Sequence, residues 1–94
     1  MPANAQWQWF TITGYVATGN RTATGTWPQV GRTVAVDPSV IPLGSTVYIQ
    51  GLGVFRAEDT GGAVIGRHID VFVATVGDAY ALTQPHLVSW TPPQ

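Results

Sequence analysis

The chain has 94 residues, a formal net charge of −1, no lysine and no cysteine. With 45% hydrophobic and 10% charged residues it is too apolar for a disordered chain, and frequent Gly and Pro interrupt any run long enough to span a membrane. The four arginines are scattered, which argues against a nucleic-acid-binding protein, and the absence of cysteine excludes disulfides and thiolate metal sites.

Short extended segments separated by Gly and Pro make up most of the chain. Residues 1–6 should be frayed, and they lack the pattern of a signal peptide. Strands are predicted for residues 7–18, 33–37, 46–50, 53–58, 69–74 and 86–90, the first with a bulge at Gly14. The segments between them are predicted as a loop at 18–32, a tight turn at 38–45, a hairpin link at 51–53, one or two helical turns at 77–82 and a tail at 91–94.

Six short strands and no long helix favour one all-β domain over residues 1–94, with its core at about 10–90. A small closed barrel is favoured over a sandwich, because closure removes the strand edges that so short a chain could not cover. Val40, Ile41 and Leu43, in the turn at 38–45, should cap the core. Trp9 and Trp90 are expected inside it.

The segment 57–70, A-E-D-T-G-G-A-V-I-G-R-H-I-D, holds three of the five acidic residues of the chain. Asp59 opens a glycine-rich loop, and Asp70 closes it next to the most apolar strand. A carboxylate at the start of an apolar strand must be paired or serve a function. Asp59 could instead be an ordinary turn residue. Asp37, before Pro38, could simply bond nearby backbone N–H groups.

Six motifs in one order resemble the 3D domain, a family named for three aspartates that also forms the catalytic part of the MltA-type lytic transglycosylases. The motifs are T-A-T-G-T (22–26), V-A-V-D-P (34–38), I-P-L-G (41–44), V-Y-I (47–49), A-E-D-T-G-G-A (57–63) and H-I-D-V (68–71). The resemblance covers about residues 10–90, and the three aspartates map onto Asp37, Asp59 and Asp70.

The resemblance implies a six-stranded double-psi β-barrel with one or two short helical turns. It also implies cleavage of the β-1,4 bond between N-acetylmuramic acid and N-acetylglucosamine in peptidoglycan, with a 1,6-anhydro-muramic product. The implied partner is the peptidoglycan glycan strand, and the implied location is the cell envelope or the outside of the cell. Additional wall-binding domains outside this chain are compatible with it, since the larger MltA enzymes carry a second domain.

Glycoside cleavage needs an acid for the leaving oxygen and stabilisation of an oxocarbenium-like transition state. The muramyl 6-hydroxyl attacks its own anomeric carbon, so one carboxyl group can act as acid and then as base. The resemblance places Asp70 in this role, and burial with like charge nearby should keep it protonated. We expect Asp59 to be its electrostatic partner and Asp37 a supporting hydrogen-bond acceptor.

Further residues are candidates for contacts with the sugar. Gly61 and Gly62 let the backbone approach closely, and Trp27 could stack on a ring. Thr24 and Thr60 are candidate hydrogen-bond partners, although threonines in turns usually bond locally. His68 could touch substrate, but an exposed loop histidine is the simpler interpretation.

No metal site and no cofactor are expected, since the chain has neither EF-hand spacing nor an HExxH motif. The family often has a lysine in G-A-I-K-G, where this chain has Ile65; the loss of that cation bears on the affinity for anionic wall groups. Two alternatives stay open on the same barrel. One is a non-catalytic carbohydrate-binding module resembling expansin and barwin domains. The other is a glycoside hydrolase with Asp70 as acid and Asp37 or Asp59 as base.

Overall fold

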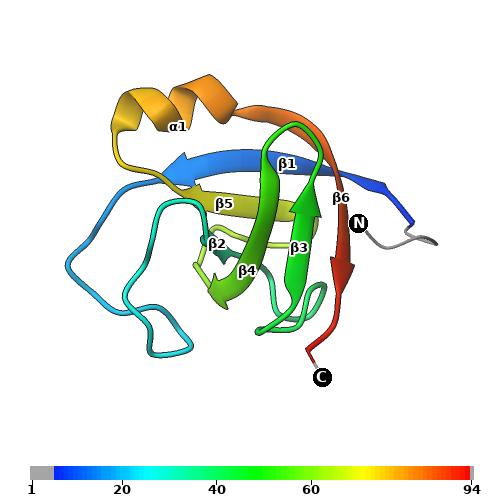
Figure 1. Ribbon diagram of the computed structural model, residues 1–94, viewed down its shortest axis with the longest axis horizontal. Coiled ribbons are helices and arrows are strands. Elements are labelled where there is room, and N and C mark those ends of the chain that lie inside the picture. The colour runs from blue at the N-terminus through cyan, green and yellow to red at the C-terminus, as the bar shows by residue number, and fades with distance from the viewer. Residues whose placement is uncertain (1–5, 94) are drawn as a thin grey trace.

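The computed structural model describes residues 6–93. Six strands and one helix follow one another along this part of the chain (Figure 1). They are β1 (Gln8–Tyr15), β2 (Thr33–Ala35), β3 (Thr46–Ile49), β4 (Gly53–Asp59), β5 (His68–Phe72), α1 (Val76–Leu82) and β6 (Gln84–Thr91). The expected fraying of residues 1–6 falls outside the described residues, apart from Gln6.

The strands close into a barrel in the order β1-β5-β2-β4-β3-β6. The pairs β1–β5 and β2–β4 are parallel, whereas the other four pairs are antiparallel. Each parallel pair joins strands that are far apart in the sequence, so the barrel is held together by long-range pairing. The predicted all-β, six-stranded double-psi barrel with a short helix is confirmed.

Alternate residues of the strands fill the barrel. The even-numbered positions Phe10 and Ile12 of β1 are 2% and 0% exposed, and they meet buried residues of β3, β5 and β6 in one core cluster. Burial of each such side chain stabilises the fold by about 1.5–3 kcal/mol. Ile41 is buried against the same cluster, with Val40 and Leu43 packed on it, which confirms that this turn caps the core.

The odd-numbered positions of β1, Trp9 among them, face outward. The side chain of Trp9 is 62% exposed, so its expected place in the core is wrong. Trp90 does pack on the core, and its ring meets that of Phe10 edge-on with centroids 5.8 Å apart.

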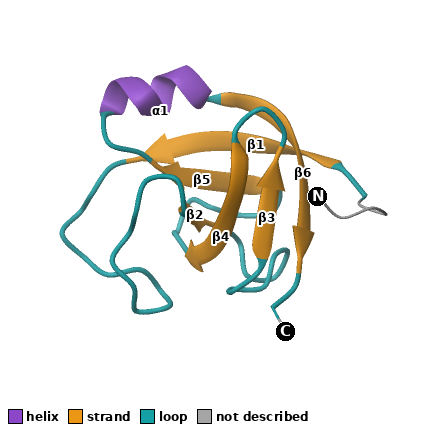
Figure 2. Cartoon of the chain, viewed as in Figure 1, coloured by secondary structure: helices purple, strands orange, loops and turns teal. Residues whose placement is uncertain are grey.

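Gly14 does not form the predicted bulge. It stays in regular parallel register opposite Val71, and the irregularity lies instead between Val34 and Ala35 of β2. A Cβ on Gly14 would come within 2.7 Å of the Cα of Ala79 in α1. Glycine therefore allows the helix to sit directly on β1, across one end of the barrel (Figure 2).

The helix starts at Val76, with Thr75 as its N-cap: the Thr75 hydroxyl accepts a hydrogen bond from the backbone N–H of Asp78. It lacks buried residues of its own, yet Ala79 and Leu82 pack against the core cluster.

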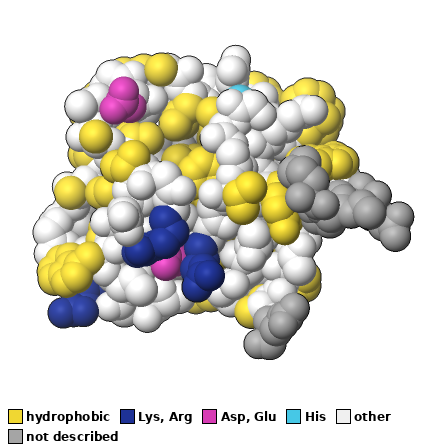
Figure 3. Space-filling model, in the orientation of Figure 1, with side chains coloured by type: hydrophobic (Ala, Val, Ile, Leu, Met, Phe, Trp, Pro, Cys, Tyr) yellow, Lys and Arg dark blue, Asp and Glu magenta, His cyan; other side chains and the backbone are white. Residues whose placement is uncertain are grey.

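Among the described residues no helix is long and apolar enough to cross a membrane. Figure 3 shows basic side chains on both sides of an acidic one on this face.

Candidate active site

A cleft with a volume of about 330 Å³ opens where strands β1, β2 and β4 end. Each of these strands contributes its last residue to the wall, and the loops that follow β1 and β4 supply most of the rest. The lining residues are Tyr15, Thr18, Asn20, Arg21, Ala35, Asp59, Thr60, Gly61, Val64 and Asp70. The cleft thus brings together two of the three aspartates singled out in the sequence.

Asp70 lies in β5, opposite Thr13 of β1. The Thr13 hydroxyl donates a hydrogen bond of 3.0 Å to Oδ1 of Asp70. Burial raises the pKa of Asp70, and the charge of Asp59 acts in the same direction, whereas the Thr13 hydrogen bond and His68 oppose the shift. Because the net pKa is raised, Asp70 holds its proton at higher pH than an ordinary aspartate does.

Asp59 ends β4 and is held by three donors. Its Oδ1 accepts hydrogen bonds from the backbone N–H groups of Ala23 (3.0 Å) and Thr60 (2.9 Å), and its Oδ2 accepts one from the Tyr15 hydroxyl (3.2 Å). Burial, with the charge of Asp59, raises the pKa of Tyr15, so the phenol remains a donor. These bonds fix a carboxylate at one wall of the cleft.

His68 is the first residue of β5 and is half-buried, so its interpretation as an exposed loop histidine is wrong. Its Nε2 lies 2.7 Å from the Thr13 hydroxyl, and its Nδ1 lies 3.0 Å from the carbonyl oxygen of Ala63. His68 is not among the residues that line the cleft. It instead contacts the hydroxyl of Thr13, which is the hydrogen-bond partner of Asp70.

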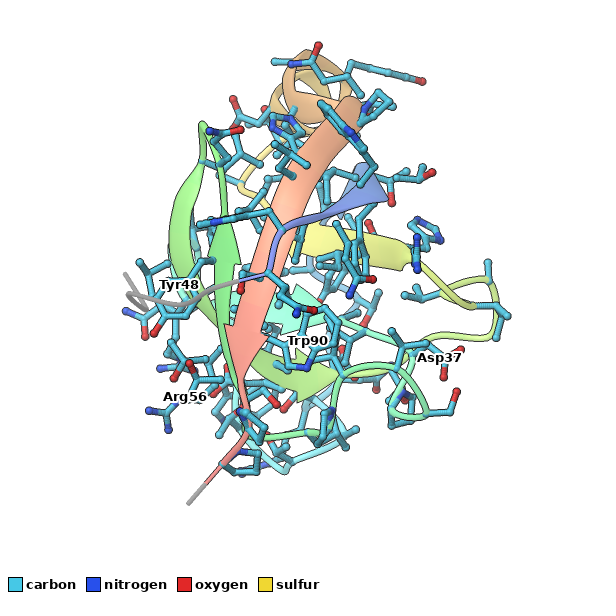
Figure 4. The ribbon with its side chains drawn as sticks, turned by 90° about the vertical axis from the view of Figure 1, so that its right-hand side faces the viewer. Asp37, Tyr48, Arg56 and Trp90 are labelled. Atoms are coloured by element: carbon cyan, nitrogen blue, oxygen red, sulfur yellow. The ribbon has the colours of Figure 1, made fainter. Side chains whose placement is uncertain are left out.

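Asp37 lies apart from the cleft, at the outer edge of the molecule in Figure 4. Its carboxylate accepts hydrogen bonds from the backbone N–H of Gly66 (2.8 Å) and from the N–H (3.0 Å) and hydroxyl (2.7 Å) of Ser39. These bonds, that from Gly66 above all, hold the pKa of Asp37 below its usual value. Asp37 thereby ties the glycine-rich loop to the turn after β2.

Only some of the residues predicted to contact the sugar lie in the cleft. Thr60 and Gly61 line the cleft, whereas Gly62 does not. The Thr24 hydroxyl lies 3.2 Å from that of Thr22, and the Thr24 backbone N–H donates to the carbonyl of Glu58 on β4 (3.0 Å), which anchors the loop to the barrel. Trp27 is 57% exposed and outside the cleft, but the guanidinium of Arg21, which lines it, lies 4.8 Å from the Trp27 ring centroid.

Glu58 anchors the long loop that follows β1. The Glu58 side chain is buried, and its Oε1 accepts hydrogen bonds from Nε of Arg32 (3.0 Å) and from the Thr33 hydroxyl (2.6 Å). Arg32 also donates to the carbonyl of Trp27 at 2.9 Å. This ion pair joins a buried carboxylate to a guanidinium whose side chain is 40% exposed, and it fixes the end of the loop that carries Arg21.

Sequence reasoning missed Thr13 and Tyr15, which hold the two carboxyl groups, and the cleft residues Thr18, Asn20 and Arg21. A signal was present for the first two: they stand two residues apart on a strand, and therefore on the same face. No comparable pattern marks the other three. Within residues 6–93 no group of three or more metal-ligating side chains is close enough to hold an ion.

Comparisons with known proteins bear on the family and the fold of this chain. The family model described as "3D domain" matches residues 32–84. The cell wall-binding protein YocH of Bacillus subtilis is 58% identical over 48 residues, which are 51% of this chain and 17% of YocH.

Two solved structures share the fold. The lytic transglycosylase LtgG of Burkholderia pseudomallei superimposes with a TM-score of 0.58 and 25% identity, over 76% of this chain and 25% of that one. MltA of E. coli, solved with bound chitohexaose, gives a TM-score of 0.63 at 20% identity, over 80% of this chain and 28% of that one. The matched region is thus less than a third of each of these relatives.

Proposed function

The chain belongs to the 3D domain family, and from this membership and the geometry of its cleft we propose that it is a peptidoglycan lytic transglycosylase domain. The observation that carries the proposal is the pair of unlike aspartates in one cleft. Asp70 is half-buried with a raised pKa, and Asp59 is held as a carboxylate acceptor by three donors. Acid-assisted cleavage of a glycoside needs a protonated carboxyl group for the leaving oxygen, and a fixed carboxylate nearby can stabilise the positive charge of the transition state.

The comparisons support the substrate class. LtgG is described as a lytic transglycosylase, and YocH as a cell wall-binding protein. For this chain we infer a partner in peptidoglycan glycan strands and a location in the cell envelope or outside the cell. Ile65, where the family often has a lysine, is 68% exposed. Arg21 lines the cleft and supplies a cation to anionic groups of the substrate.

In the proposed reaction, protonated Asp70 donates its proton to the glycosidic oxygen as the bond from that oxygen to the anomeric carbon of N-acetylmuramic acid breaks. The Asp59 carboxylate stabilises the positive charge that develops on the sugar. The muramyl 6-hydroxyl then attacks the anomeric carbon and gives its proton to the Asp70 carboxylate. The products are a 1,6-anhydro-muramic end and a free N-acetylglucosamine 4-hydroxyl, and Asp70 is protonated again.

Thr13 and Asp37 have supporting roles in this proposal. The Thr13 hydroxyl donates to Asp70, so it stabilises the carboxylate after proton transfer. Asp37 acts through the loop, because its bond to Gly66 holds the segment that carries Thr60 and Gly61 into the cleft.

Digestion of purified peptidoglycan, with mass analysis of the muropeptides, tests the proposal. We expect products one water lighter than hydrolytic ones, and we expect Asp70→Asn to slow their formation by about 10²–10⁴-fold. Products that end in ordinary reducing muramic acid would show a hydrolase in place of a transglycosylase.

A second candidate function is a non-catalytic cell-wall-binding module, which the 58% identity to YocH favours. It predicts binding to insoluble peptidoglycan without soluble products, equal for the parent and Asp70→Asn. Soluble anhydro products from the parent protein would reject it.

A further inference from the structure

A second pocket adjoins the candidate active site, on the other side of Tyr15. It has a volume of about 440 Å³ and lies between α1 and the C-terminal end of β1. Its residues from the helix side, Val76, Ala79, Tyr80 and Thr83, are spaced as one face of a helix. The wall toward β1 consists of Thr13, Gly14, Tyr15, Val16 and Thr18. We call it the helix pocket.

The helix pocket and the active-site cleft share two wall residues, Tyr15 and Thr18. Asp70 lines the cleft, while Thr13, whose hydroxyl bonds Asp70 at 3.0 Å, lines the helix pocket. The acid is therefore at the boundary between the two cavities. A group that protonates a glycosidic oxygen must lie at the bond between two sugars, so the substrate has to occupy space on both sides of it.

We propose that the helix pocket is the subsite for the N-acetylglucosamine residue next to the bond that is cleaved, while the muramyl residue occupies the cleft. This assignment rests on the proposed function for the identity of the glycan. The two sugars differ in charge, since the lactyl group of muramic acid carries a carboxylate or an acidic peptide and N-acetylglucosamine is neutral. The cleft contains the cation of Arg21 beside the Asp59 carboxylate and Asp70, whereas no charged side chain is among the described residues that line the helix pocket.

The surfaces of the helix pocket suit a neutral acetamido sugar. The ring of Tyr80 is 78% exposed and can stack on a sugar face. Val76 and Ala79 offer apolar surface to an acetamido methyl group. The Thr83 hydroxyl donates to the carbonyl of Ala79 at 2.7 Å, and its oxygen can still accept a hydrogen bond from a sugar hydroxyl. The contact of Gly14 with Ala79 fixes α1 on β1, so the pocket is preformed.

Titration of the isotope-labelled protein with chitotetraose, an oligomer of N-acetylglucosamine alone, tests this assignment by NMR. We expect shifts of the backbone amides of Val76, Ala79, Tyr80 and Thr83. Tyr80→Ala should weaken binding roughly three- to tenfold, the worth of one stacking contact. Since Tyr80 is exposed on the helix and alanine is a good helix former, this variant should fold like the parent.

The matched control is Trp9→Ala, which removes an exposed aromatic ring outside both cavities. It should bind chitotetraose as the parent does. Unchanged affinity in Tyr80→Ala, or shifts confined to the cleft, would overturn the assignment even if anhydro products are formed. Binding at the helix pocket without any anhydro product would uphold the subsite and reject the proposed reaction, so the two failures are distinguishable.

Discussion

Replacement of Gly14 by alanine tests how tightly α1 is seated on the barrel. The new Cβ would lie 2.7 Å from the Cα and 2.8 Å from the Cβ of Ala79. The nearer atom belongs to the backbone, so the whole helix must shift. Overpacking of this kind costs about 1–3 kcal/mol. Replacement of a glycine within a strand by alanine otherwise stabilises the fold by about 0.5–1 kcal/mol. We therefore expect Gly14→Ala to lower the free energy of unfolding by about 1–2 kcal/mol, or the melting temperature by roughly 5–15 °C.

The assay is urea denaturation followed by tryptophan fluorescence, with Gly62→Ala as the matched control. A Cβ on Gly62 meets nothing within 4 Å, so this change should leave stability within about 0.5 kcal/mol of the parent. Equal stabilities for the two alanine variants would refute the argument that glycine is required at position 14 by the helix. A shifted helix should also reduce the affinity of Gly14→Ala for chitotetraose.

Three further variants test the ionisable groups. Asp70→Asn should lower the rate of anhydro-product formation by about 10²–10⁴-fold. The same variant should melt higher than the parent at neutral pH, because a raised pKa means that ionisation of Asp70 destabilises the fold as pH rises through that pKa; equal melting curves would contradict this. Tyr15→Phe removes a donor to Asp59 and should lower the rate roughly tenfold without unfolding, as circular dichroism can check. The pKa of Asp37 is lowered, so its carboxylate stabilises the fold above its unfolded pKa and loses this effect as pH falls through the folded value. The melting difference between Asp37→Ala and the parent should accordingly shrink in acid, and a difference independent of pH would count against it.

The sequence was informative where local chemistry decides structure. Alternating apolar positions and Gly/Pro punctuation located all six strands within a few residues. The apolar residues of the turn at 38–45 pointed correctly to a cap on the core. The segment 57–70 pointed to Asp59 and Asp70, and the structure places both in one cleft.

Errors arose where two segments distant in the chain meet. Gly14 looked like a bulge because its partner, Ala79, is 65 positions away on α1, and no local pattern records that contact. Trp9 looked like a core residue because an aromatic strand can bury either face, and the burial of Phe10 settles which one. His68 looked like a loop residue because its pairing with Thr11 belongs to the parallel register of β1 and β5.

A small closed β-barrel, with a carboxylate at each end of one glycine-rich loop, follows from the pattern of residues alone. The division of the three aspartates between the cleft and the outer surface depends on the folded barrel. The parallel pairing of β1 with β5 places Thr13 against Asp70, and Tyr15, at the end of β1, reaches Asp59. The carboxylate of Asp37 lies outside the cleft and accepts hydrogen bonds from Ser39 and Gly66. Strand register and barrel closure are properties of the whole chain, so the residues that tune each carboxyl group cannot be found from the segment that carries it.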